Sequence, residues 1–390
     1  MTILLILIAL TFIGLGLGDP LLGSAWPSMY GQFGVDAAAA GILGMLISGS
    51  TIVGTYVSAR ILRRLGTGVV VAAGLTVIGI TVLGFSMANH FIILCFLAIP
   101  LGFSIGNVGA SVNGFLTMHY SAKYLNWANC LWGVGATVTP VVMTFSLMRL
   151  GGWMAGYRIV GVAQLALAVI LLGALSQWKK VRLDRGKRVG EGTKEALGAA
   201  KLLRLPGARF AILLFFFQGG LEATLALWST TYLVVARDIA RETATSWLTL
   251  YYLGLTGGRF LSGFASMRVP TRKMARLGIC FIAAGIITIA LPFGWNLMPG
   301  LVLIGLGVAP IFPSFTHCTP GIFGKQHTQA MVGFQMASLF LGASTLPPLF
   351  GLIGSNFGYQ FFPLYAGILL TIMATAAAIL YTRHPDKGAL

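Results

Sequence analysis

The sequence predicts an all-α integral membrane protein, with twelve transmembrane helices arranged as two pseudo-symmetric six-helix halves. Three observations predict this fold class. Hydrophobic residues make up 57% of the 390-residue chain and charged residues only 9%, long apolar runs follow one another along its whole length, and short motifs of the first half recur in the second. A soluble domain of this size could not remove so much apolar surface from water.

Apolar runs of about 18 residues or more locate the expected spans, because a helix rises about 1.5 Å per residue and the hydrocarbon core of a bilayer is about 30 Å thick. The expected spans are 3–30, 37–59, 68–88, 90–118, 126–149, 156–177, 208–235, 243–266, 273–292, 296–322, 328–355 and 359–382. A charged, glycine-interspersed stretch separates the first six from the last six. We therefore expect an N-terminal half at 1–177, a basic linker at 178–207 and a C-terminal half at 208–390.

The positive charges predict the orientation in the membrane. The net charge is +17, and 21 of the 26 Lys and Arg residues fall on one side of the membrane if the N-terminus is inside. Cytoplasmic loops carry such an excess, so we expect both termini and the linker in the cytoplasm, with the protein in the cytoplasmic (inner) membrane. The basic linker could touch anionic membrane lipid. The same distribution argues against a nucleic acid partner.

This orientation predicts the outcome of a labelling experiment at Lys187, within the linker. A cysteine placed there should not react with a membrane-impermeant thiol reagent added to intact cells, because the residue is expected to lie in the cytoplasm. Ready labelling from outside would contradict the orientation.

An acid and a proline interrupt the first span. Within residues 14–30, three glycines precede Asp19 and Pro20, and the carboxyl group lies about 24 Å along the helix. A charge at that depth costs several kcal/mol unless it faces water or a partner, and irregular backbone is tolerated there only beside protein or a cavity. The stretch is therefore expected to form or border a functional site.

The second half resembles a weaker copy of the first. An acid, a tryptophan and a tyrosine recur in the same order and near-spacing in spans 3–30 and 208–235: Asp19, Trp26 and Tyr30 against Glu222, Trp228 and Tyr232. The pattern Gly-Ala-x-x-x-Pro occurs at 135–140 and again at 342–347. Two parallel halves related by an axis normal to the membrane would place a binding site near the midplane between them.

Catalytic chemistry is not indicated. The four cysteines lie in expected spans without a Cys-x-x-Cys motif, which predicts neither a disulfide nor a metal site. The five histidines are scattered, and no metalloprotease or nucleophile-elbow motif occurs, so we expect no enzyme activity, metal or cofactor. No ATP-binding motif occurs either.

The whole chain resembles the major facilitator superfamily. The twelve spans, the basic central loop and a Gly-x-x-x-Ser-x-Arg-x-x-Arg-Arg-x-Gly turn at 54–66 carry this resemblance. More narrowly, two motifs are similar to the branch around fucose permease: Gly18-Asp19 with Ala25-Trp26-Pro27, and Asn126-x-x-Asn129-x-x-x-Gly133-x-Gly135-Ala136. That branch is understood as sugar transporters, several of them coupled to protons.

Two departures from the family pattern bear on mechanism. Ala59 stands where the family's loop usually carries an acid before the arginine, which removes the acid of the usual gating contact. Relatives also tend to carry an acid in the fourth span and a histidine at the position of Asn129. The corresponding stretch here, 107–113, contains no acid, so a proton site in that span is not expected.

The resemblance therefore implies a secondary active transporter that works by alternating access, moves a small polar solute such as a sugar and couples it to protons. A drug or lipophile exporter and an uncoupled facilitator on the same fold remain open alternatives. An exporter would need a more apolar cavity, with fewer Asn and Gln residues. The expected partners are a sugar or similar polyol, protons and membrane lipid, and we expect a monomer.

Candidate site residues follow from depth and chemistry. Among the nine acidic residues only Asp19 and Glu222 lie inside expected spans, and a carboxyl group removed from water binds a proton more readily, so both are candidate proton carriers; the alternative is a structural hydrogen bond. Tryptophan faces can stack on sugar C–H edges and amides can bond hydroxyl groups. The candidate substrate ligands are Trp26, Asn107, Asn113, Asn129, Trp132, Gln218, Trp228, His317 and Gln335. The candidate gating or structural residues are Arg60, Arg63, Arg64, Gly135, Pro140, Arg259, Gly342 and Pro347.

Overall fold

The computed structural model describes residues 2–119, 122–175, 177–178, 205–265, 268–294 and 296–383. Within these ranges the regular elements are helices, and no residue lies in a β-strand. The first half contains α1 (Thr2–Gly18), α2 (Leu21–Met29), α3 (Ala39–Leu65), α4 (Thr67–Met87), α5 (Phe91–His119), α6 (Ala122–Arg149) and α7 (Trp153–Gly173). The second contains α10 (Ala208–Val235), α11 (Arg241–Ala265), α12 (Thr271–Ala290), α13 (Leu297–Val308), α14 (Ile311–Phe323), α15 (Lys325–Phe357), the 3-10 turn η1 (Tyr359–Phe361) and α16 (Phe362–Arg383).

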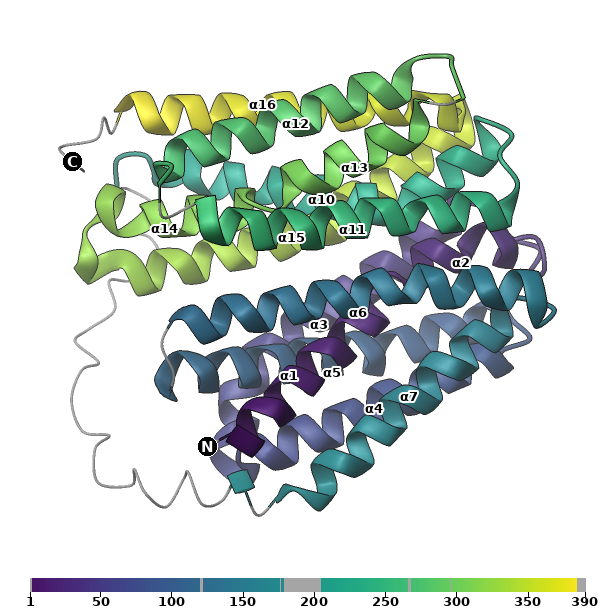
Figure 1. The fold of residues 1–390 in the computed structure, drawn as a ribbon, viewed down its shortest axis with the longest axis horizontal. Coiled ribbons are helices and arrows are strands. Elements are labelled where there is room, and N and C mark those ends of the chain that lie inside the picture. The colour runs from purple at the N-terminus through teal and green to yellow at the C-terminus, as the bar shows by residue number, and fades with distance from the viewer. Residues whose placement is uncertain are drawn as a thin grey trace.

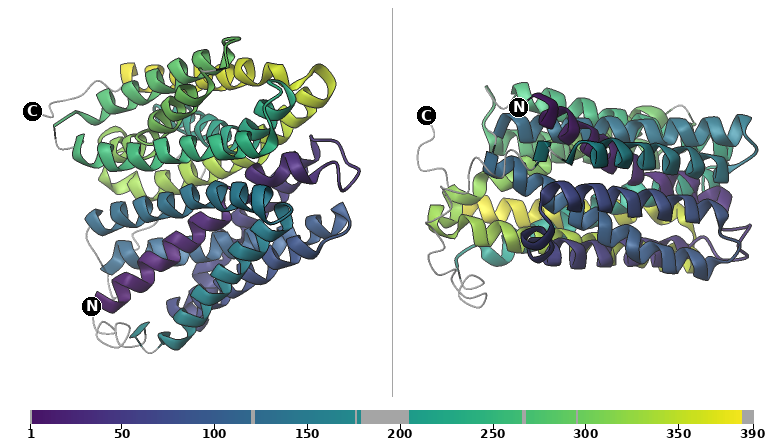
Figure 2. Two further views of the ribbon diagram at one scale, coloured as in Figure 1. Left: turned by 45° about the vertical axis from the view of Figure 1, so that its right-hand side comes forward. Right: turned by 90° about the horizontal axis from the view of Figure 1, so that it is seen from below.

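The helices form two bundles that lie side by side (Figure 1), one made by α1–α7 and the other by α10–α16. Seen from below, the long helices of both bundles run in roughly the same direction (Figure 2). Between the bundles, α6 lies against α11, α3 against α15 and α2 against α10. Because each of these pairs joins the two halves, a site between the halves is built from these helices.

The bundles approach most closely at the end that carries α2. A Cβ atom on Gly23 of α2 would collide with the carbonyl oxygen of Ala226, and one on Gly41 of α3 would lie 2.7 Å from the Cα atom of Pro348. Small residues allow helix backbones to come this close. The bundles diverge toward the opposite end, where α1 begins and α16 ends (Figure 1).

Two expected spans are broken into two helices, each at a proline. The first breaks at Asp19 and Pro20, between α1 and α2, as the sequence predicts. The span expected at 296–322 breaks at Ala309 and Pro310, between α13 and α14, which the hydropathy pattern does not reveal. A proline supplies no backbone donor and so ends the preceding ladder of hydrogen bonds.

Eleven helical spans of the described chain are long and apolar enough to cross a membrane, counting α1 with α2 and α13 with α14 as one span each, and α11 falls short of that standard. It is nevertheless a continuous helix at the position of the span expected at 243–266. Its hydropathy is low because it carries Arg241, Glu242 and Arg259 and several hydroxyl groups. One face of α11 packs against α6 of the other half, where Arg259 and Thr256 contact it, so these two polar residues lie at the interface. These helices confirm the all-α membrane fold class.

The internal repeat is visible in the packing of two helix pairs. In the first half, Cβ atoms on Gly16 of α1 and Gly135 of α6 would overlap backbone carbonyl oxygens of the facing helix. In the second half, Gly219 of α10 and Gly342 of α15 make the same kind of crossing. Gly135 and Gly342 begin the two Gly-Ala-x-x-x-Pro patterns. The repeated pattern therefore corresponds to a repeated close helix crossing.

Candidate functional site

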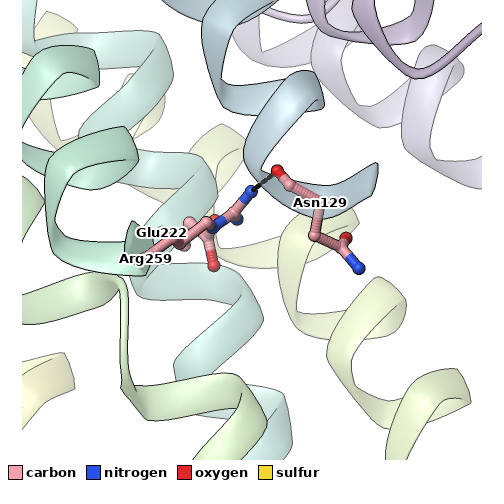
Figure 3. A network of polar contacts seen from close by, with 3 residues as sticks. All are labelled: Asn129, Glu222 and Arg259. Carbon is pink, nitrogen blue, oxygen red and sulfur yellow. Dashed lines mark hydrogen bonds and ion pairs between the residues drawn. The ribbon is translucent and has the colours of Figure 1, made fainter. Parts of the chain in front are cut away.

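A charged cluster lies at the interface between the halves. Arg259 of α11 places its Nη2 atom 3.9 Å from Oε1 of Glu222 on α10, within the second half. Its Nη1 atom donates a hydrogen bond of 3.3 Å to the backbone carbonyl oxygen of Asn129 on α6, in the first half. Figure 3 shows the guanidinium group reaching across to α6. Arg259 thus connects the two halves.

The indole ring of Trp132 completes the contact of Arg259 with the first half. The guanidinium carbon lies 4.5 Å from the ring centroid, a cation–π geometry that contributes about 0.5–2 kcal/mol depending on its exposure to water. Further along the same pair of helices, the hydroxyl oxygens of Thr137 and Thr256 are 3.2 Å apart. The contact between α6 and α11 is therefore polar as well as close.

Asp19 lies at the break between α1 and α2, where its side chain is exposed. The positive charge of Arg259 acts on both Asp19 and Glu222, and the charge of Asp19 acts on Glu222. Each acid follows an equivalent crossing glycine, Gly16 or Gly219, by three residues. The two acids therefore occupy equivalent places in the two halves, and Arg259 pairs with Glu222 while its charge also reaches Asp19.

Two tyrosines that the sequence reasoning missed lie beside this cluster. Tyr251 and Tyr252 of α11 are each 1% exposed, and neither hydroxyl group has a hydrogen-bond partner within the described chain. Their ring centroids are 4.9 Å apart, and both rings lie within the electrostatic reach of the two acids. Tyr252 precedes Arg259 by two helical turns, a spacing that could have identified it.

The tryptophans expected to bind substrate in the broken first span and in α10 are buried and packed in this conformation. Trp26 is fully buried and donates a 2.6 Å hydrogen bond to the carbonyl oxygen of Ala37. Trp228 is also fully buried and donates a 2.8 Å bond to the carbonyl oxygen of Pro347. Because neither ring has accessible surface in this conformation, neither contacts a solute in it, and a part for either in solute binding stays a prediction.

The candidate amides differ in their surroundings. Asn107 is 5% exposed, and Gln335 is 2% exposed and accepts a 3.1 Å hydrogen bond from Thr319. Asn113 donates a 2.9 Å bond to the carbonyl oxygen of Gly109 within α5. Only the backbone of Asn129 contacts Arg259, and its exposed side chain points away from the guanidinium group (Figure 3). Buried Asn107 and Gln335 are therefore not available to a solute in this conformation.

The remaining candidates lie outside the cluster. His317 is exposed on α14, and Arg60, Arg63 and Arg64 are exposed near the end of α3. Pro140 and Pro347 are buried within α6 and α15. Within the described ranges, no group of three or more His, Cys, Asp or Glu side chains could hold a metal ion.

Comparisons with known proteins identify the architecture. The profile of the Major Facilitator Superfamily matches residues 4–240 and 228–390. Among solved structures the chain is similar to the nucleoside transporter NupG, at 12% identity and a TM-score of 0.77, covering 96% of this chain and 98% of that one. It is also similar to a bacterial homologue of the human lysosomal transporter Spinster in an inward-facing, unoccupied conformation, at 16% identity and a TM-score of 0.66, covering 98% and 95%. Likeness at this identity shows a shared fold. No curated protein matches the chain.

Proposed function

The chain belongs to the major facilitator superfamily, and we propose that, as a secondary transporter of that family, it moves a small polar solute across the cytoplasmic membrane in symport with protons. Membership of the family makes it a transporter and not an enzyme. The proposed solute is a sugar or a similar polyol, as the resemblance to the fucose permease branch suggests.

The observation that carries the proposal is the Arg259–Glu222 ion pair at the interface between the halves, 3.9 Å long and within electrostatic reach of Asp19. With both acids ionised, two negative charges and one positive charge leave the cluster at −1. One bound proton makes it neutral. Because a net charge is costly to enclose in a low-dielectric midplane, the halves can close around a protonated cluster more easily than around an unprotonated one. This difference supports coupling to one proton.

In the proposed cycle, Arg259 is a bridge that opens when a proton binds. Asp19 takes up the proton and passes it to Glu222, which removes the negative charge that holds the guanidinium group and weakens the contact. Arg259 can then leave the face of Trp132, and that indole face becomes accessible to the solute. The Asn129 amide, one turn earlier on α6, is the proposed partner for a solute hydroxyl group.

The direction of opening follows from the proposed orientation. If both termini are cytoplasmic, the closed end that carries α2 faces outward, and the diverging end faces the cytoplasm. The described conformation is then inward-facing, in which the proton leaves through Asp19 for the cytoplasm and Arg259 re-forms its contact with Glu222. Return of the empty carrier, whose cluster then has its net charge of −1, would complete the cycle and is expected to be the slow step, because the halves close less easily around that charge.

Truncation of Trp132 tests whether its indole face binds the solute. We expect Trp132→Ala to raise the solute concentration for half-maximal uptake about tenfold, since loss of an aromatic stacking partner costs about 1.4 kcal/mol. Uptake would be measured per folded molecule. Trp127→Ala is the matched control, because Trp127 lies on the same helix and is 56% exposed. If the two variants behave alike, Trp132 is not part of the solute site.

A panel of labelled solutes in proteoliposomes, with and without a pH gradient, separates this proposal from the alternatives. Sugars should be taken up, with accumulation only under the gradient. Nucleosides belong in the panel because NupG, whose fold is similar, is a nucleoside transporter. Uptake of lipophilic drugs alone would favour an exporter, and equilibration without accumulation would favour an uncoupled facilitator.

A further inference from the structure

A small cavity inside the second half borders Glu222. Its lining comes entirely from helices of that half, namely α10, α12, α13, α14 and α16: Gln218, Leu221, Glu222, Ile282, Val308, Ile311 and Met373. The cavity leaves about 10 Å³ for the centre of a water-sized sphere. That is about the smallest space that holds one water molecule.

Gln218 is the unusual member of this lining. It is 3% exposed, and neither its Nε2 atom nor its Oε1 atom has a hydrogen-bond partner within the described residues. Burying an amide without a hydrogen-bond partner is unfavourable, so Gln218 is expected to have a partner that the protein chain does not supply. Gln218 precedes Glu222 by four residues on α10, which places both side chains on one helix face.

We propose that one water molecule occupies this cavity and joins Gln218 to Glu222. A buried water makes about three hydrogen bonds. It can accept one from the Gln218 amide nitrogen and donate one each to the Gln218 amide oxygen and the Glu222 carboxylate. A metal cation wants about six oxygen ligands, whereas the side chains of the lining offer three oxygens among five apolar residues. The chemistry of the lining therefore favours a water molecule over a metal cation.

The water makes Gln218 a positioning residue rather than the substrate ligand that the sequence suggests. Glu222 gains a partner within the second half in addition to Arg259. When the bridge opens and Arg259 leaves, the carboxyl group stays held toward α10 instead of following the guanidinium group. This functional step rests on the proposed coupling through Glu222, whereas the presence of the water does not.

A density map that resolves ordered water tests the site directly, using the full-length protein and three variants. The wild-type protein and Val308→Ala should show one peak at about 2.7–3.2 Å from both Gln218 and Glu222. Val308→Ile should lose the peak, because the added carbon fills the space of the water molecule. Gln218→Met should also lose it, because the methionine side chain lacks the amide that bonds the water. An empty cavity in the wild-type map, or a peak with the shorter ligand distances of a metal ion, would overturn the proposal.

Transport by the same variants tests the positioning role. Val308→Ile should lower proton-driven accumulation several-fold, and Val308→Ala should leave it near the wild-type level. If the water peak is absent in Val308→Ile and present in Val308→Ala, as expected, but the two variants accumulate solute equally, the positioning role is overturned. The proposed transport is then left intact. Absence of proton-driven accumulation in the wild-type protein would instead refute the proposed function, independently of the water.

Discussion

Asp19→Asn is expected to abolish the accumulation of solute driven by a pH gradient, while exchange of solute at equal pH stays largely intact. The amide keeps most of the shape and hydrogen-bonding capacity of the carboxyl group but cannot bind and release a proton. Because exchange does not require net proton movement, it separates loss of coupling from loss of binding. Both quantities would be measured in proteoliposomes containing equal amounts of folded protein.

The matched control for this variant is Asp36→Asn. Asp36 is an exposed acid whose Oδ1 atom accepts a 2.7 Å hydrogen bond from the backbone amide of Ala38, a role that an asparagine can retain. We expect accumulation by this variant to equal that of the wild type. If Asp19→Asn also accumulates solute when protons are the only driving ion, Asp19 is structural and the proposed symport fails.

Arg259→Met is expected to reduce both accumulation and exchange, each by tenfold or more. The substitution removes the contacts to the first half at Trp132 and Asn129 and leaves Glu222 without its ion-pair partner. An uncompensated charge at membrane depth is costly. Arg259→Lys should recover only part of the activity, since an ammonium group keeps the charge but lacks the planar fork and the stacking surface of a guanidinium.

Arg241→Met is the control for the arginine variants, because Arg241 lies on the same helix and is exposed at its other end. We expect it to transport normally. Combining Arg259→Met with Glu222→Gln removes both charges of the ion pair, so the double variant should recover protein abundance without recovering transport. If Arg259→Met exchanges solute at the wild-type rate at equal protein abundance, the Arg259 bridge has no part in transport.

Hydropathy and the positions of helix-breaking residues were sufficient to predict the main elements of the fold. The expected spans agree with the helices because a bilayer requires long apolar segments whose backbone groups are satisfied internally. The break at Asp19 and Pro20 was predictable because an acid and a helix-breaking residue coincide at membrane depth. The break at Ala309 and Pro310 was not, because that proline stands among apolar residues.

The position of a residue along its span does not reveal which way its side chain points, and this limited the prediction of the site. Trp26 and Trp228 lie at suitable positions along their spans, yet their rings point into the interior of each half. Arg259 was assigned a gating or structural part, but its contact with Glu222 depends on how α10 and α11 are rotated. Those rotations are set by close glycine crossings between helices, which no single span contains.

The central claim is that solute and proton move together, and solute-driven proton movement tests it most directly. Proteoliposomes with a pH-sensitive dye inside would receive an inward solute gradient at equal starting pH, with the membrane potential clamped. We predict that the lumen acidifies with wild-type protein and does not with Asp19→Asn, although solute enters in both cases. Entry of solute into wild-type vesicles without any change in internal pH would contradict the account.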